Sequence, residues 1–253
     1  MPELLKDKVV VITGAASGNG RAMALRFAEE GAKAIVVADV RETPREGGAT
    51  TVELVEEQGA RAVFVPTDVT DRAQVRAAVA AAGEFGGLDV FVNNAGITRF
   101  EEDPLATEDA VFDLMMNINV KGAWIGSQEA VRDWTARGVG GSLINLSSIG
   151  GIQGSRATPL YSASKGAIRL LTYSFADAYG AKGIRVNAIH PGLVDTEMIR
   201  TDLAAFSGGG SIPMERLARP REIADAAVFL ASDLSTYANG SSLVVDGGFT
   251  TSM

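Results

Sequence analysis

The chain has 253 residues, of which 46% are hydrophobic and 21% charged, proportions that suit one large α/β domain. Its 31 acidic and 23 basic residues give a formal net charge of −8, which argues against nucleic acid or an anionic membrane as a partner. Cysteine is absent, so disulfides and thiol catalysis are excluded, and the lack of a signal peptide or membrane-length apolar run predicts a cytoplasmic protein.

Short β-branched runs alternate with longer amphipathic stretches, the pattern of βαβ units and a parallel sheet. The predicted strands are Val9–Thr13, Ala34–Ala38, Ala62–Pro66, Val90–Asn93, Leu143–Leu146, Val186–Ile189 and Leu243–Val245. Helices are predicted near 20–30, 50–58, 71–85, 107–137, 161–180 and 221–231. Because most strands are uninterrupted apolar runs, helices should cover both faces. The predicted fold is a single doubly wound, Rossmann-like α/β domain, 1–253, with a seven-stranded parallel sheet flanked by helices.

One irregular stretch, about 196–215, interrupts this alternation and contains three consecutive glycines and a proline. A long connection inside a compact domain is usually a lid or a binding element. Its apolar side chains suit either a lid over an apolar substrate or the core of short helices: Met198, Leu203, Phe206 and Met214.

The first strand runs directly into a glycine-rich turn, Thr13-Gly14-Ala15-Ala16-Ser17-Gly18-Asn19-Gly20, and helix-forming residues follow. Such a turn lets the backbone approach a pyrophosphate, and the helix N-terminus supplies free N–H groups. Asp39 ends the second strand, where a carboxylate binds the adenosine ribose hydroxyls and repels a 2′-phosphate. Arg41, two residues later, would soften that preference. The predicted cofactor is NAD.

Tyr161 and Lys165 are four residues apart, so a helix places their side chains on one face, about 5–6 Å apart at Cβ. An ammonium beside a phenol favours the phenolate and lowers the tyrosine pKa from about 10. A phenol that exchanges a proton near neutral pH is a general acid/base. The pair therefore predicts acid/base catalysis by Tyr161.

With this pair, the Thr-Gly-x-x-x-Gly-x-Gly turn resembles the short-chain dehydrogenase/reductase family, and the resemblance covers essentially the whole chain. Three further motifs follow in family order: Asp68-Val69, Asn93-Asn94-Ala95-Gly96, and Pro191-Gly192 with Val194 and Thr196. The resemblance implies adenine contact by the first, support of the sheet by the second and nicotinamide binding by the third. The cofactor-binding residues it implies are Gly14, Ser17, Gly18, Asn19, Gly20, Asp39, Asp68, Val69, Asn94, Ala95, Gly96, Tyr161, Lys165, Pro191, Gly192, Val194 and Thr196. Asn19 departs from the family, which usually has an apolar residue there.

The same resemblance adds two catalytic residues, Ser148 and Asn119, to Tyr161 and Lys165. Ser148 is expected to donate a hydrogen bond to the substrate oxygen, Lys165 to bind the nicotinamide ribose, and Asn119 to hold a water. Ser147 and Asn117 remain alternatives to Ser148 and Asn119. The single histidine, His190, is not expected to be a general base, and no residues have the spacing of metal ligands.

These observations favour an oxidoreductase that interconverts a secondary alcohol and a ketone with NAD(H). Arg99 is a candidate contact for an anionic group. The alternative enzyme is a 3-oxoacyl-(acyl-carrier-protein) reductase, which would need a basic docking patch such as Arg132 with Arg137; the non-enzyme alternative is a catalytically silent dinucleotide-binding regulator. The resemblance also implies a homotetramer formed through the helices near 107–137 and 161–180 and the C-terminal segment.

Overall fold

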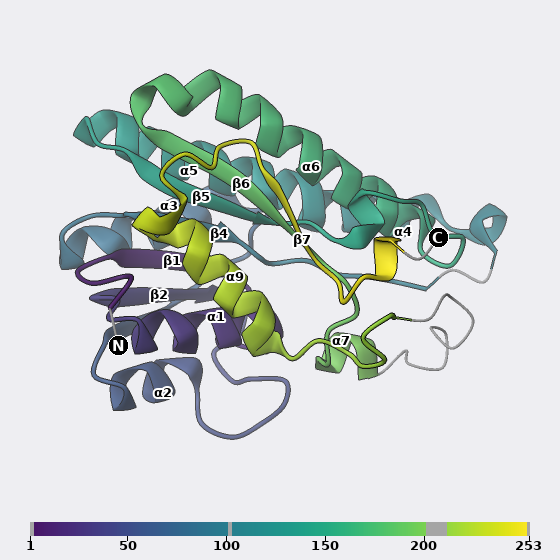
Figure 1. The fold of residues 1–253 in the computed structure, drawn as a ribbon, viewed down its shortest axis with the longest axis horizontal. Coiled ribbons are helices and arrows are strands. Elements are labelled where there is room, and N and C mark those ends of the chain that lie inside the picture. Colours follow the sequence, from purple (N-terminus) through teal and green to yellow (C-terminus); the bar gives the residue numbers. More distant parts are fainter. Residues whose placement is uncertain (1–2, 101–102, 201–211, 252–253) are drawn as a thin grey trace.

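All seven predicted strands are present in the computed structural model, which describes residues 3–100, 103–200 and 212–251 (Figure 1). They form one parallel sheet in the order β3-β2-β1-β4-β5-β6-β7. Val11, for example, pairs with Val36 on one side and with Phe91 on the other. The strand bounds are β1 Val9–Thr13, β2 Ala34–Asp39, β3 Arg61–Pro66, β4 Val90–Asn93, β5 Gly141–Leu146, β6 Ile184–Pro191 and β7 Ser242–Val245. The predicted fold class is confirmed.

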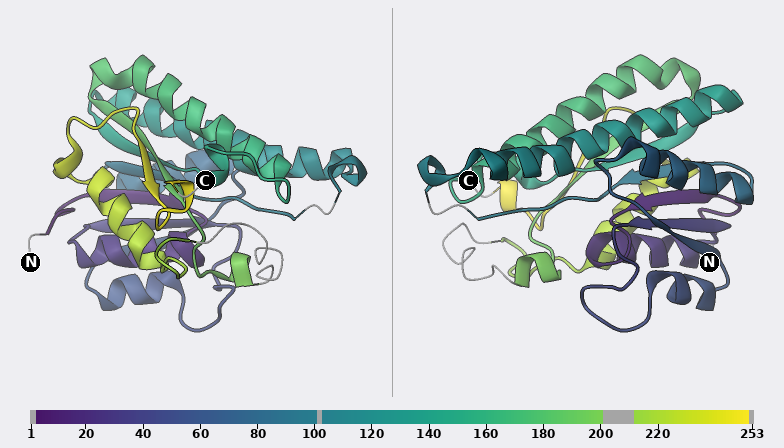
Figure 2. Two further views of the ribbon diagram at one scale, coloured as in Figure 1. Left: turned by 45° about the vertical axis from the view of Figure 1, so that its right-hand side comes forward. Right: turned by 180° about the vertical axis from the view of Figure 1, so that it is seen from behind.

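Helices cover both faces of the sheet (Figure 2). One face packs against α1 Gly18–Glu29, α2 Thr51–Glu57 and α9 Pro220–Ala231; the other packs against α3 Arg72–Ala81, α5 Gly122–Arg137 and α6 Pro159–Tyr179. Successive residues of β1 alternate between the two cores, with Val10 and Ile12 in one and Val9 and Val11 in the other. This alternation follows from the two-residue period of a strand and explains why the strand sequences are apolar throughout.

The predicted helix at 107–137 is divided into two helices. α4 Asp109–Met116 is followed by a π-helical turn, Asn117–Lys121, and then by α5. At the start of α5 a Cβ on Gly122 would lie 2.6 Å from Val69 Cγ2, so the helix packs directly on the loop after β3. Single π-helical turns are rare and frequently occur at functional sites.

The order of the strands reverses between β1 and β4, which are neighbours in the sheet. Ligands of doubly wound sheets bind outside the carboxyl ends of the strands at such a point. Thr13 Oγ1 joins the two loops there by accepting hydrogen bonds from the backbone N–H groups of Asn94 (3.0 Å) and Ala95 (3.1 Å). Over the described ranges, every helix is too short or too polar to cross a lipid bilayer.

Candidate active site

A cleft of about 780 Å³ opens at the carboxyl ends of the strands around this point. It brings together residues of the glycine-rich turn, the end of β2, the loops after β3, β4 and β6, and the start of α6. Every predicted cofactor or catalytic residue lines it except Gly20 and Asn119, which lie behind its wall. The lining also includes residues that sequence reasoning did not select, among them Arg45, Thr67, Leu114 and Lys121.

The glycines of the turn are required by close backbone packing. Gly14 has φ +66°, and a Cβ on it would lie 2.9 Å from Ala95 Cα. A Cβ on Gly20 would overlap the carbonyl oxygen of Gly14 and lie 2.6 Å from Asn94 Nδ2. Asn94 Nδ2 donates to the carbonyls of Thr13 (2.9 Å) and Gly14 (3.1 Å), so it holds the turn against the loop after β4.

Substituting Gly20 by alanine is expected to lower the free energy of unfolding by about 1–3 kcal/mol, because a well-packed site must shift to admit a methyl group. The displaced turn should also bind a dinucleotide more weakly. Urea unfolding and quenching of protein fluorescence by NADH measure the two effects. Gly83→Ala is the matched control, since nothing lies within 4 Å of its Cβ position; equal behaviour of the two variants would contradict the packing argument.

Asp39 stands at the end of β2 beside the glycine-rich turn. Its Oδ2 accepts a hydrogen bond from Ala16 N (3.0 Å), which fixes the carboxylate at the rim of the cleft. Arg41 and Arg45 line the same end of the cleft. Asp39 thus stands where a carboxylate can meet ribose hydroxyls.

The residues of this end fit a dinucleotide. Gly18 N, at the start of α1, donates to the Glu46 carboxylate (3.2 Å), so the helix terminus binds an anionic oxygen within the chain itself. Asn19 Oδ1 is buried and has no hydrogen-bond partner among the described residues. A ligand group that donates a hydrogen bond at the turn would satisfy this oxygen. The position is therefore polar in this chain, whereas the family usually has an apolar residue there.

Ser148, Tyr161 and Lys165 meet at the centre of the cleft. Ser148 follows β5, and its side chain forms a hydrogen bond with Tyr161. Lys165, one helical turn after Tyr161, has its Nζ 5.6 Å from the centre of the Tyr161 ring. The predicted alignment on one face of α6 is therefore present.

The pKa of Tyr161 shifts in the opposite direction to the prediction. Burial raises the pKa of the phenol, and the hydrogen bond with Ser148 only partly offsets this. The ammonium of Lys165 is buried and donates to the carbonyl of Leu146 (2.7 Å). Burial lowers the pKa of Lys165 itself to about 8.

The structure separates the residues that sequence left as alternatives. Ser147 Oγ is turned away and donates to the carbonyl of Lys165 (2.9 Å), which leaves Ser148 beside Tyr161. Asn119 is buried in the π-helical turn, where its amide bonds both backbone groups of Ile97 (2.8 and 2.9 Å) and Ser164 Oγ (3.0 Å). Asn117 is exposed. The side chain of Asn119 therefore holds the loop after β4 beside α6.

The segment after β6 closes the cleft opposite the glycine-rich turn. A Cβ on Gly18 would lie 3.6 Å from Thr196 Cγ2, so the two walls approach here. Val194 is buried and forms a bridge with Ala218. The helix α7 Glu197–Arg200 follows. Of the apolar side chains predicted in the loop 196–215, Met198 and Met214 are exposed, whereas Leu203 and Phe206 lie outside the described residues.

Known proteins share both the sequence pattern and this arrangement. The profile of a family described as "Enoyl-(Acyl carrier protein) reductase" matches residues 14–250. A cis-4-hydroxycyclohexanecarboxylate dehydrogenase of Sinomonas cyclohexanicum is 41% identical over 99% of both chains. The chain belongs to the short-chain dehydrogenase/reductase family.

Two further proteins bear on the cofactor and substrate of this dehydrogenase/reductase. An L-rhamnose-1-dehydrogenase of Scheffersomyces stipitis is 38% identical over 98% of both chains. A structure assigned to a 2-deoxy-D-gluconate 3-dehydrogenase of Agrobacterium tumefaciens, with bound NADP, superposes with a TM-score of 0.87 at 32% identity over 99% of both chains. The protein is therefore an oxidoreductase of the dehydrogenase type.

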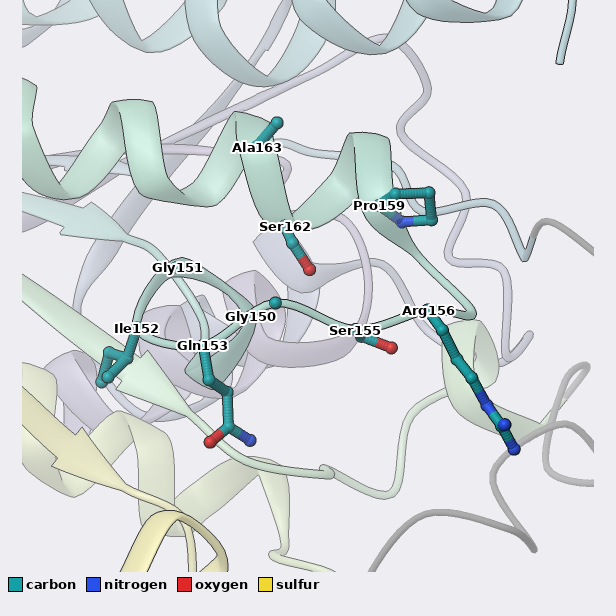
Figure 3. Close-up of a pocket in the computed structure, with 10 residues that line it drawn as sticks. Gly150, Gly151, Ile152, Gln153, Ser155, Arg156, Pro159, Ser162 and Ala163 are labelled. Carbon is teal, nitrogen blue, oxygen red and sulfur yellow. The ribbon is translucent and has the colours of Figure 1, made fainter. Parts of the chain in front are cut away.

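A second hollow of about 580 Å³ adjoins Ser148 and Tyr161 (Figure 3). It lies between the loop after Ser148 and the start of α6. A Cβ on Gly150 would lie 3.6 Å from both Ser148 Oγ and Tyr161 Cδ1, so the hollow borders the reacting groups. Ser162 projects from α6 toward the loop (Figure 3), and its hydroxyl has no hydrogen-bond partner in the described part of the chain.

Arg132 and Arg137, the predicted basic patch of an acyl-carrier-protein reductase, each form an ion pair within the chain. Arg132 pairs with Glu129, and Arg137 pairs with Asp133 (2.7 Å) and the carbonyl of Leu88. Asp133 balances the charge of Arg137, whereas the single carboxylate of Glu129 is shared by Arg132, Arg72 and Arg76. Separately, the described ranges contain no cluster of three or more His, Asp or Glu side chains that could hold a metal ion.

Proposed function

We propose that this enzyme interconverts a secondary alcohol and a ketone with NAD(H), using Tyr161 as the general acid/base. The observation that carries the proposal is the convergence of Ser148, Tyr161 and Lys165 in the same cleft as Asp39 and the glycine-rich turn. A dinucleotide spanning the cleft from Asp39 would end beside Tyr161. The names of the relatives, which are dehydrogenases of hydroxyl compounds, support the same reaction class.

The nicotinamide, when bound, supplies or accepts the hydride. The chain's own residues handle the oxygen and the proton. Ser148 Oγ donates a hydrogen bond to the substrate oxygen and stabilises the charge that develops on it. Tyr161 gives its proton to that oxygen in reduction and removes it in oxidation. Lys165 places an ammonium between Tyr161 and the proposed site of the nicotinamide ribose.

The proposed preference for NAD depends on the carboxylate of Asp39. Replacing Asp39 by asparagine should lower kcat/KM for NAD by about tenfold or more, because a charged hydrogen bond to the ribose is lost. The same variant should use NADP better than the parent does, since Arg41 and Arg45 remain beside the site. Glu42→Gln removes the same charge at an exposed position outside the cleft and is the control. An unchanged ratio of the two cofactors in Asp39→Asn would contradict the assignment.

We propose that the substrate occupies the hollow of Figure 3, under a lid formed by the loop 196–215. Arg156 lies on its rim and has no ion-pair partner among the described residues. A free guanidinium there would attract a carboxylate on the substrate. The relative from Sinomonas, whose name specifies a ring alcohol bearing a carboxylate, supports the inclusion of hydroxy acids in the substrate class.

We also propose a homotetramer in which α5 and α6 contribute an interface. Trp124 on α5 and Leu170 on α6 are 42% and 63% exposed, an unusual exposure for large apolar side chains on two adjacent helices. Light scattering of the purified protein measures the oligomeric state.

Initial rates on a panel of cyclic and acyclic secondary alcohols, hydroxy acids and their ketones test the proposed reaction with each cofactor. We expect turnover of ring hydroxy acids with NAD and of the matching ketones with NADH. Tight binding of NADH without turnover of any member would instead support a catalytically silent regulator. Preference for 3-oxoacyl thioesters with NADPH would support the acyl-carrier-protein reductase.

A further inference from the structure

A continuous chain of hydrogen bonds joins the outer helix α6 to the main chain of Ser148. Arg169 Nε donates to Tyr173 Oη (3.0 Å), and Tyr173 Oη lies 2.8 Å from Ser242 Oγ on β7. Ser242 Oγ is 3.0 Å from His190 Nε2, and His190 Nδ1 is 2.9 Å from the carbonyl oxygen of Ser148. His190 is fully buried on β6. The proposed reaction assigns no part to His190 or to the three side chains beyond it, which are Ser242, Tyr173 and Arg169.

The direction of every bond in this chain follows from its ends. A carbonyl oxygen can only accept, so Nδ1 of His190 carries a proton and donates to Ser148. In a neutral imidazole Nε2 is then an acceptor, and Ser242 must donate its hydroxyl proton to it. The oxygen of Ser242 is left to accept from the Tyr173 hydroxyl, whose own oxygen accepts from Arg169.

The imidazole remains neutral, as this arrangement requires. Burial lowers the pKa of His190, the hydrogen bond to Ser148 opposes the shift, and the positive charges of Arg169 and Lys165 lower the pKa further. A protonated ring would donate from Nε2 as well. Ser242 would then have to accept that bond, and the direction of its hydrogen bond with Tyr173 would reverse.

Ser148 needs a fixed main chain because it lies where the β-ladder stops. The last backbone bond between β6 and the end of β5 runs from Ser147 N to Ile189 O (2.9 Å). Ser148 itself is extended, with φ −170° and ψ 164°, and the next residues turn away as a short 3₁₀ helix, Ile149–Gly151. The bond from His190 therefore ties one more residue, Ser148, to β6. The hydroxyl of Ser148 is the group that bonds Tyr161.

We propose that His190 is a positioning residue: by holding the carbonyl of Ser148 it fixes the Ser148 hydroxyl beside Tyr161, and Ser242 with Tyr173 provides the partner of Nε2 that keeps the ring in this orientation. The inference depends on the proposed role of Ser148 in catalysis. A purely structural role would lower stability without changing the rate of each folded active site.

The test compares His190→Leu, which removes both ring nitrogens, with His190→Asn, whose amide nitrogen can take the place of Nδ1. The rate is divided by the concentration of sites that bind NADH, so that a loss of folded protein does not lower the measured kcat. We expect His190→Leu to lower kcat about tenfold with the affinity for NADH unchanged, and to raise the isotope effect on kcat with a carbinol-deuterated alcohol. His190→Asn should recover kcat to within about threefold of the parent. An unchanged kcat per site in His190→Leu, or failure of His190→Asn to recover it, overturns the proposal.

Ser242→Ala provides the second test and decides the matter where His190→Leu does not fold. Without the serine hydroxyl the buried Nε2 of His190 has no partner, so the ring is held at one end only and its bond to the Ser148 carbonyl is less well fixed. We expect kcat per site to fall by about threefold or more. Ser241→Ala is the matched control, because the hydrogen bonds of Ser241 are made by its backbone, whose N–H donates to Asn187 Oδ1 (2.9 Å) and whose carbonyl accepts from Ala188 N (2.9 Å). Equal rates for Ser242→Ala and Ser241→Ala overturn the inference, whereas an inactive parent overturns the proposed function instead.

Discussion

Replacing Tyr161 by phenylalanine is expected to lower kcat by about 10²–10⁴-fold, the usual contribution of a general acid/base. The ring remains in place, so binding of the dinucleotide should hardly change. Because burial raises the pKa of the Tyr161 phenol, the group is protonated at neutral pH and suited to donate to a ketone oxygen. Steady-state rates in the reductive direction, with NADH affinity measured in parallel, provide the test.

Tyr179→Phe is the control for this variant, since it removes a hydroxyl from the far end of the same helix. It should retain the activity of the parent. If Tyr161→Phe also retained full turnover, the proton would have to come from another group, and the proposed mechanism would be wrong.

Replacing Lys165 by methionine is expected to abolish most of the activity and yet to stabilise the fold at pH 7. Lys165 is 5% exposed, and burial lowers its pKa from 10.5 to about 8. Burial of the charged lysine therefore lowers the free energy of unfolding by about 3 kcal/mol at neutral pH, from 1.36 kcal/mol per pKa unit; this is the charge-burial penalty. Methionine removes this penalty but also removes the hydrogen bond to Leu146, so a net gain of about 2 kcal/mol is expected.

The sign of the pH dependence follows from the lowered pKa. Below pH 8 the lysine is charged in both states and the penalty is present in full. Between about 8 and 10.5 the unfolded state binds more protons, so the stability of the parent rises with pH. The advantage of Lys165→Met should therefore shrink across this range and disappear above it.

Urea unfolding of Lys165→Met and of the parent, at pH 7 and at pH values up to 10.5, measures this difference. Lys182→Met, at an exposed position, removes the same charge and should show no such trend. A variant that is less stable than the parent by the same amount at every pH would contradict the buried-charge argument.

Local sequence patterns were sufficient for the architecture and for the position of the cleft. The apolar runs of the strands and the glycines of the first turn act over a few residues, where period and backbone sterics decide the structure. Gly14 and Gly20, for example, are required by contacts within and beside the turn itself. The division of the helix at 107–137 was not predicted, because the packing of Gly122 on Val69 and the bonds of Asn119 to Ile97 connect residues far apart in the sequence.

The sequence by itself determined the parallel sheet, the glycine-rich turn, Asp39 at the end of β2, and the presence of Tyr161 and Lys165 on one helical face, since each depends on neighbours along the chain. Only the tertiary structure decided between Ser147 and Ser148, joined Arg137 to the carbonyl of Leu88, and joined His190 to Ser148. The pKa of Tyr161 belongs to this second group. Its direction depends on how much water the surrounding elements exclude, and the hydrogen bond with Ser148 opposes the shift only in part.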